Sequence, residues 1–418
     1  MNILIQNTRI WTEQKLTHFD EIVIVDGIWS PEKPEKIDRI IDFKNAIMMP
    51  ALSEIHADFK EPGLEYVYNL KDGVEAMMKG GFDTALLSPA TEPLIDNPAT
   101  VEWVENKLQK FPVNVWLSGC LSLERKGKFL TEMVEMQREG CLALSEGLAP
   151  LSNSRFLRNA LKYATQTGSR VHLLPMDAEL GTGVMHAGAL SLRYGISGIS
   201  VQAEEIAVFK LICLAEMTQC PLHLKHITSI RSIQMIREAQ AKGLDLTFDV
   251  TLNHLMFSDQ DLETLNCNLK LMPPLRSEEN RKLLLEAFYA GKIDVLSSQH
   301  TPVLPEFKNC PIDQADFGAV GLETALSVLW SILNGDVNDK VAQVQKVFVE
   351  GPRRVLGLEK LEIKVGCEIS AVVFDDTKTI RFTPTQFAAL VHNSPYLNKE
   401  FVGSVVALIS QKEIHELN

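Results

Sequence analysis

The chain has 418 residues, of which 45% are hydrophobic, 23% are charged and 7% are aromatic. This composition is typical of a folded globular protein and excludes disorder along the whole chain. The 41 Lys and Arg residues and the 54 Asp and Glu residues give a formal net charge of −13. A chain this acidic lacks the positive surface that binds nucleic acids or anionic membranes, so we expect neither as a partner.

Cysteines and apolar runs bear on the cellular location. The seven cysteines are odd in number and contain no C-x-x-C pair, which is typical of reduced thiols rather than of disulfides or a structural zinc site. No apolar run approaches the roughly 20 residues that span a bilayer. The first residues also lack the basic and apolar regions of a signal peptide. We therefore predict a cytoplasmic protein.

Both ends of the chain are predicted to be β-structure. Short apolar runs between turn residues predict strands at Asn2–Ile10, Glu21–Ile28, Ile37–Met49, Ile369–Phe374 and Phe401–Ile409. We expect the two ends to pack together as one small β-sandwich domain, made of residues 1–50 and 355–418.

Between the ends, short apolar runs alternate with segments of helical period. The predicted strands are Ala51–His56, Asp83–Ser88, Asn114–Ser118, Cys141–Leu144, Arg170–Leu174, Pro221–His226, Asp245–Val250 and Asp294–Ser298. The predicted helices include Ser154–Thr165, Gln202–Met217, Ser229–Lys242, Ser277–Tyr289 and Leu322–Leu333. Eight strands with helical crossovers predict an α/β fold, a (β/α)₈ TIM barrel over residues 51–354.

In such a barrel, reactive side chains belong at the carboxyl ends of the strands. The segment from His56 to Gly63, at the end of the first barrel strand, reads HADFKEPG. It resembles the amidohydrolase superfamily, and within it the dihydroorotases, whose segment reads H-x-H-x-R-E-P-G. The resemblance matches His56 to the first metal-binding histidine and puts Asp58 in place of the second. Lys60 stands where the family has an arginine that binds the substrate carboxylate.

The resemblance covers nearly the whole chain and extends to the other metal-binding positions. Glu146 stands at the position of the metal-bridging carboxylate, in a segment one residue shorter than the family's. Pro175 stands where the family has its third metal-binding histidine, while His226 keeps the last one. Because proline has no donor atom, the binuclear site of the family is expected to be incomplete.

The substrate-binding and catalytic positions also depart from the family pattern. Ala90 and Met272 replace two asparagines that bind the substrate, and Gln299 replaces the catalytic aspartate. A neutral carboxamide does not accept a proton near pH 7, so general acid–base catalysis worth on the order of 10²–10⁴ in rate is expected to be lost. Lys60 is a point charge where an arginine fork is usual. We therefore expect no catalytic and no substrate-binding residues.

The resulting prediction is a protein that is not an enzyme and needs no cofactor: a degenerate dihydroorotase homologue, or pseudoenzyme. By resemblance, such a chain would be a structural or assembly subunit for the catalytic chain of aspartate carbamoyltransferase in de novo pyrimidine biosynthesis. We expect a homodimer within a larger hetero-oligomer.

The alternative is a mononuclear metal-dependent amidohydrolase acting on a cyclic amide or ureide. It would hold one Zn²⁺ on the residual candidates His56, Asp58, Glu146 and His226.

Overall fold

The computed structural model describes residues 1–417. Its central feature is a parallel sheet of eight strands that are hydrogen-bonded in chain order. These strands are β5 (Leu52–Ala57), β6 (Phe82–Leu87), β7 (Asn114–Gly119), β8 (Cys141–Ser145), β9 (Val171–Leu173), β12 (Leu222–Leu224), β13 (Leu246–Thr251) and β14 (Val295–Ser297). A parallel bridge between Ala57 and His300 joins the first strand to the end of the last. The sheet therefore closes, which confirms the predicted TIM barrel.

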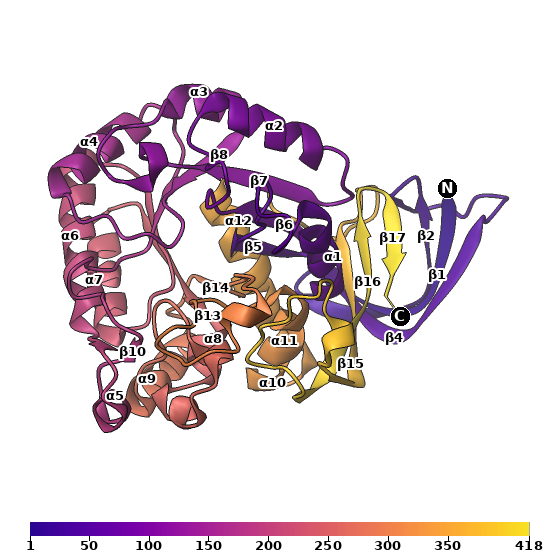
Figure 1. Cartoon of the computed structure of the whole chain (residues 1–418). Helices are drawn as coiled ribbons and strands as arrows, with labels where there is room; N and C mark the ends of the chain where they lie inside the picture. The colour runs from indigo at the N-terminus through magenta and orange to yellow at the C-terminus, as the bar shows by residue number, and fades with distance from the viewer. Residues whose placement is uncertain (418) are drawn as a thin grey trace.

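Helices form the outer layer of the barrel (Figure 1). They are α1 (Leu70–Gly80), α2 (Pro98–Leu108), α3 (Met133–Arg138), α4 (Ser154–Ala164), α6 (Gln202–Thr218), α7 (Ile230–Ala241), α9 (Glu278–Tyr289), α10 (Ala325–Ile332), α11 (Val337–Gln345) and α12 (Gly351–Leu356). Helix α4 illustrates their construction. The Asn153 side chain caps its first turn, and Phe156, Leu157, Ala160 and Leu161 recur on the face that is buried against the barrel.

Smaller helices and strands lie within the loops at the carboxyl ends of the barrel strands. They are β10 (Met185–His186), β11 (Gly198–Ile199), α5 (Ala189–Tyr194) and α8 (Leu252–Met256). Nothing in the described part of the chain is a helix long and apolar enough to cross a membrane.

The two ends of the chain form a second sheet, of seven strands, beside the barrel (Figure 1). Its strands are β1 (Asn2–Thr12), β2 (Lys15–Val25), β3 (Ile28–Ser30), β4 (Arg39–Pro50), β15 (Ala371–Arg381), β16 (Glu400–Ser410) and β17 (Glu413–Glu416). Antiparallel pairing of β4 with β15 joins the two ends. The sheet buries a core of its own, which includes Ile5, Trp29 and Met48. The domain boundaries near residues 50 and 355 stay a prediction.

Glu54 fastens the first barrel strand to the last. It is fully buried, and its Oε1 accepts a hydrogen bond from Ser297 Oγ at 2.8 Å while its Oε2 accepts one from Ser298 N at 2.7 Å. The same Oε1 also accepts a bond from the backbone N–H of His56 at 3.1 Å. Glu54 therefore holds together the ends of β5 and β14, which are the strand ends that lead to His56 and Gln299.

Candidate active site

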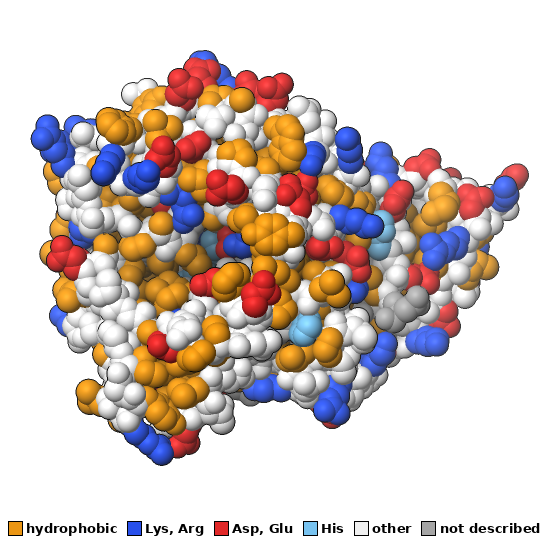
Figure 2. All heavy atoms as spheres, in the orientation of Figure 1, with side chains coloured by type: hydrophobic (Ala, Val, Ile, Leu, Met, Phe, Trp, Pro, Cys, Tyr) orange, Lys and Arg blue, Asp and Glu red, His pale blue; other side chains and the backbone are white. Residues whose placement is uncertain are grey.

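Two histidines predicted from the sequence come together inside the mouth of the barrel. His56 ends β5 and His226 follows β12, and their ring centroids lie 5.1 Å apart with the rings nearly perpendicular. Both side chains are buried. Neither Nε2 atom finds a hydrogen-bond partner among residues 1–417. Figure 2 shows ionisable side chains in the hollowed centre of this face, surrounded mainly by hydrophobic ones.

Asp249 on β13 orients His226. Its Oδ1 lies 2.8 Å from His226 Nδ1, and its Oδ2 lies 3.0 Å from His223 Nε2. All three side chains are fully enclosed. Burial alone would raise the pKa of Asp249, but the two histidines lower it far below its usual range. An ionised carboxylate accepts from His226 Nδ1–H, so Nε2 is the ring nitrogen that is left without a partner among the described residues.

The backbone at His226 is also unusual. Its φ is 56°, in the left-handed region that non-glycine residues rarely adopt. Gln299, at the end of β14, has a φ of 55°. Strain of this kind concentrates at functional sites. In this barrel it turns both residues out of the strand direction where the strands end.

Asp58 and Lys60 lie beside His56. Lys60 Nζ is 3.4 Å from Asp58 Oδ2, and both side chains are mostly buried. Burial alone would raise the pKa of Asp58. Lys60 and His56 outweigh this effect and hold the pKa well below its usual value. Within the described chain, Asp58 Oδ1 accepts no hydrogen bond. Asp58 therefore presents an ionised oxygen near His56 that has no hydrogen-bond partner among the described residues.

Lys225 places a buried amine against the same centre. Its Nζ lies 3.2 Å from Ser145 Oγ and 3.4 Å from His56 Nδ1, and it donates to the carbonyl of Gly147. Burial lowers the pKa of Lys225 to about 7. Burial, followed by the nearby Lys225, lowers the pKa of His56 well below its ordinary value, so that ring is neutral.

Glu146 makes its side-chain hydrogen bonds with the loop after β7. Its Oε1 accepts hydrogen bonds from the backbone and hydroxyl of Ser122, at 2.7 and 2.9 Å, and its backbone carbonyl accepts from Arg125. Burial raises the pKa of this carboxyl. One oxygen of Glu146 therefore holds the loop after β7, while Oε2 has no partner in the described chain, so no hydrogen bond to His56 or His226 accompanies the match to a bridging carboxylate.

The remaining replaced positions line the same mouth. Gln299 Nε2 donates to the carbonyl of Met272 at 2.7 Å, and Gln299 Oε1 has no partner in the described residues. The Met272 side chain packs against an apolar cluster that includes Leu174 and Met176. Ala90 is half-buried in the loop after β6. These side chains offer apolar contact and one amide, in place of the hydrogen bonds of the family.

The barrel mouth holds two histidines and Asp58 as donors for a metal ion. The Nε2 atoms of two buried imidazoles, near the carboxylate of Asp58, are of the kind that binds Zn²⁺. Across residues 1–417, however, no group of three or more His, Cys, Asp and Glu side chains is arranged to hold a metal ion. The geometry therefore supports His56 and His226 as two ligands and does not complete a three-residue site among the described residues.

A pocket of about 380 Å³ has Lys60 in its lining, although neither His56 nor His226 lines it. Lys60, Tyr66 and Val67 line one wall, and the loop after β14 supplies Thr301 and Phe317. A volume of this size suits a small cyclic molecule. Lys60 gives the pocket a cation, and Asp316 gives it a carboxylate.

Sequence reasoning missed Asp249 and Lys225. Asp249 carries a signal, because it is a lone carboxylate in the apolar strand Leu246–Thr251. Lys225 lies in the same short segment as His226, but its contacts come from β5 and β8, which are distant in the sequence.

Comparisons with known proteins agree with this geometry. Residues 45–232 match the family described as dihydro-orotase-like. The dihydroorotase of Citrifermentans bemidjiense is 31% identical, covering 99% of this chain and 99% of that protein. The dihydroorotase of Carboxydothermus hydrogenoformans is 30% identical, covering 98% of this chain and 97% of that protein.

Solved structures show the same fold. The L-hydantoinase (dihydropyrimidinase) from Arthrobacter aurescens superposes with a TM-score of 0.85 at 20% identity, covering 99% of this chain and 95% of that one. A D-hydantoinase gives a TM-score of 0.80 at 18% identity. The fold and the site define an amidohydrolase barrel. On the identity of its relatives, the chain belongs to the dihydroorotase-like family of the amidohydrolase superfamily.

This membership corrects two predictions. The prediction that the chain is not an enzyme is wrong, because curated relatives that match it over nearly its whole length carry the name of an enzyme. The prediction that it needs no cofactor is wrong as well, because this is a family of metal-dependent amidohydrolases. The physical reason lies in what the substitutions leave in place. Although Pro175 and Gln299 stand where the family has a histidine and an aspartate, His56 and His226 remain in the barrel mouth with ring nitrogens that are unpartnered within residues 1–417.

Proposed function

We propose that this chain is a metal-dependent amidohydrolase that opens a cyclic amide or ureide, with dihydroorotate as its expected substrate. The observation that carries the proposal is the Asp249–His226 contact of 2.8 Å, which leaves His226 Nε2 buried and free beside His56. A carboxylate behind a histidine is the usual second layer of a metal site, because it fixes the tautomer and raises the basicity of the ligand.

His56 and His226 would hold one ion, with Asp58 as the oxygen ligand. Bound there, the ion would polarise the ring carbonyl and supply a more acidic water. Lys60 would attract a carboxylate on the substrate, because its ammonium group lines the adjacent pocket. The apolar surface around Met272 would exclude water from one side of the ring.

Gln299 sets the expected rate of the reaction. Its carboxamide holds the Met272 carbonyl and does not take up a proton. We therefore expect slow turnover, lower by on the order of 10²-fold than for a barrel with a carboxylate at that position.

The test is hydrolysis of dihydroorotate by the zinc-reconstituted protein, with hydantoin as a neutral-ring comparison. The proposal expects turnover of dihydroorotate that disappears in His226→Ala and persists in His18→Ala, which removes an exposed histidine of the terminal sheet. An inert reconstituted protein, or equal activity in His226→Ala, would overturn it.

We also propose that this chain assembles as a homodimer with the catalytic chain of aspartate carbamoyltransferase in the cytoplasm. The family resemblance supports this, and Ile206, Phe209 and Met217 on α6 are exposed apolar side chains of the kind found in interfaces. Light scattering after gel filtration tests it. A complex larger than either protein is expected, and two separate peaks at micromolar concentration would contradict it.

A further inference from the structure

The barrel behind His226 holds a group of buried polar side chains. His223 on β12 and Asp249 on β13 are 0% exposed, and Thr247 on β13 is 8% exposed. The inside of a TIM barrel is usually filled by branched apolar side chains, and a buried polar group costs free energy unless it is hydrogen-bonded. These three residues therefore call for a role beyond filling space.

The pairing of the strands places these side chains on one face of the sheet. His223 pairs with Thr247 of β13 on one side and with His172 of β9 on the other. Residues that pair in register point to the same face, and so does Asp249, two residues after Thr247. Asp249 lies nearer the carboxyl ends of the strands, where His226 follows β12. The polar side chains therefore lead from the middle of the strands to His226.

Hydrogen bonds connect these residues to His226 without a break. His223 Nδ1 lies 2.8 Å from Thr247 Oγ1, and His223 Nε2 lies 3.0 Å from Asp249 Oδ2. The other carboxylate oxygen, Oδ1, lies 2.8 Å from His226 Nδ1. Asp249 is therefore held on both oxygens, and turning its carboxylate would break both contacts.

The protons of this hydrogen-bonded chain have one consistent arrangement. The carboxylate of Asp249 only accepts, so His223 donates to it from Nε2. Burial lowers the pKa of His223, so the ring is neutral and its Nδ1 accepts from the Thr247 hydroxyl. The carbonyl of Leu222, at 3.4 Å, is a more distant acceptor for that hydroxyl. Thr247 thus fixes the tautomer of His223, and His223 supplies the second donor to Asp249.

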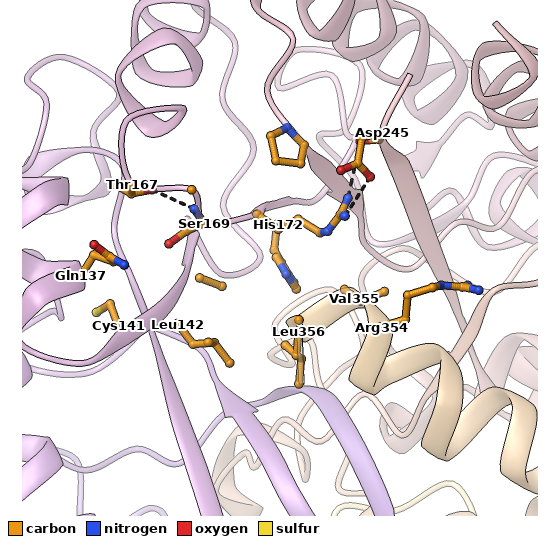
Figure 3. A pocket seen from close by; sticks show the side chains of 15 residues that line it. Gln137, Cys141, Leu142, Thr167, Ser169, His172, Asp245, Arg354, Val355 and Leu356 are labelled. Carbon is orange, nitrogen blue, oxygen red and sulfur yellow. Dashed lines mark hydrogen bonds and ion pairs between the residues drawn. The ribbon is translucent and has the colours of Figure 1, made fainter. Parts of the chain in front are cut away.

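The chain of hydrogen bonds does not continue past His223 to the other end of the barrel. The ring of His172 packs against His223 with centroids 4.8 Å apart, and neither nitrogen of His172 has a hydrogen-bond partner among residues 1–417. His172 in turn lines a pocket of about 290 Å³ at the amino-terminal ends of the strands, together with Leu356 of α12 (Figure 3). The hydrogen bonds of His223 are therefore directed toward the candidate active site alone.

We infer that His223 is a positioning residue. By holding Asp249 Oδ2, it keeps Asp249 Oδ1 turned toward His226 Nδ1, so that His226 Nε2 is left for a metal ion. The inference rests on the proposed function, because that metal ion belongs to the proposed reaction. His223 acts on the reaction only through Asp249.

Nuclear magnetic resonance of metal-free protein carrying ¹⁵N-labelled histidine tests the inference, because it reads the tautomer of His226 directly. His226→Ala identifies the signals of this ring. We expect a proton on Nδ1 of His226 in the wild type. His223→Phe keeps an aromatic ring but removes the donor, so His226 should become a mixture of tautomers. His223→Gln keeps an N–H donor for Asp249 and should restore the pattern of the wild type.

Zinc affinity, measured by calorimetric titration of the metal-free protein, is the second readout. His223→Phe should weaken Zn²⁺ binding by about tenfold or more, and His223→Gln should weaken it less. Thr247→Val removes only a hydroxyl and should change the affinity in the same direction, which keeps the inference testable if His223→Phe does not fold. Thr251→Val is the matched control. It removes a hydroxyl of the same strand that lies 2.7 Å from His254 Nδ1, outside this chain, and should bind zinc as the wild type does.

The outcomes separate this inference from the proposed function. An unchanged His226 tautomer and zinc affinity in His223→Phe would overturn the role of His223 and leave the proposed function standing. Equal impairment in His223→Gln and His223→Phe, or equal affinities in Thr247→Val and Thr251→Val, would overturn it as well. If the wild type does not bind zinc, the proposed function fails, and the tautomer of the metal-free protein still decides whether His223 positions His226.

Discussion

Asp249 and His226 form a buried pair in which Asp249 Oδ1 lies 2.8 Å from His226 Nδ1. The pair joins β13 to the end of β12, and His223 completes it from the other carboxylate oxygen. Because Nδ1 is the donor in this contact, Nε2 is the ring nitrogen that remains for a ligand, and it has no partner among the described residues. Asp249, on the neighbouring strand β13, therefore determines which ring nitrogen of His226 is left for a ligand.

Asp249→Asn tests this positioning. The amide no longer fixes the tautomer of His226, so zinc affinity should fall by about 10- to 100-fold. Calorimetric titration of the metal-free protein with Zn²⁺ measures the change. Asp20→Asn, at a carboxylate that is 93% exposed in the terminal sheet, is the control and should bind zinc as the wild type does. Unchanged affinity in Asp249→Asn would show that the pair has no role in metal binding.

Gln299→Asp should increase turnover. Asp is among the residues that tolerate the left-handed backbone at this position, where φ is 55°. The new carboxylate accepts a proton at the strand end, so kcat for dihydroorotate should rise on the order of 10²-fold. Gln299→Asn keeps an amide and should give no increase. Equal rates for the two variants would indicate that position 299 takes no part in proton transfer.

Lys60→Ala should separate charged from neutral substrates. Lys60 lines the pocket of about 380 Å³, and its ammonium group would attract the carboxylate of dihydroorotate. We expect KM for dihydroorotate to rise about tenfold or more, with a much smaller change for hydantoin, which has no carboxylate. Lys60→Arg keeps the charge and should retain most of the binding. A parallel rise for both substrates would mean that Lys60 supports the site without contacting the anion.

Glu105→Gln should stabilise the protein in a pH-dependent way. Burial raises the pKa of Glu105 on α2 to about 7. The folded state therefore holds a proton that the unfolded state releases between about pH 4.5 and 7, so this group destabilises the protein increasingly as pH rises through that window.

Thermal unfolding at pH 5 and pH 8 measures the effect. The glutamine variant should have a higher Tm than the wild type at pH 8 and nearly the same Tm at pH 5. Glu102→Gln, at an exposed position on the same helix, provides the control. A stability difference that is independent of pH would exclude the titration of Glu105 as its cause.

Glu54→Ala should destabilise the closure of the barrel. The change leaves Ser298 N and Ser297 Oγ without their acceptor. Denaturant unfolding should show a loss of about 3 kcal/mol, since each buried donor without a partner costs about 1–3 kcal/mol. Glu54→Gln keeps one acceptor oxygen and should lose less. Equal stability of the alanine variant and the wild type would mean that the strand ends are held by other contacts.

Most of the fold could be predicted because its signals are local. Each barrel strand is an apolar run of a few residues, and the predicted strand Asn114–Ser118 differs from β7 only by one residue at its end. The predicted strand Pro221–His226 is longer than β12, which ends at Leu224. The sequence remains compatible with a strand after Leu224, but the left-handed backbone of His226 takes the chain out of its hydrogen-bonded pairing with the neighbouring strands.

The site could be predicted only in part, because its contacts are between strands. His56 and His226 occupy motif positions and lie together as expected. The sequence does not show that Glu146 turns toward Ser122, or that Lys225 reaches His56, because each contact depends on a loop or strand remote in the chain. Counting lost family residues also led to the wrong prediction of a chain without activity or metal. The free nitrogens of two oriented imidazoles become visible only in the folded barrel.

Zinc stoichiometry tests the central claim most directly. Metal-free protein is titrated with Zn²⁺ in the calorimeter, and the metal retained after gel filtration is measured by mass spectrometry. The account predicts one tightly held zinc ion per chain, lost in His226→Ala and retained in His18→Ala. No retained zinc in the wild type, or equal retention in His226→Ala, would contradict a metal centre at His56 and His226.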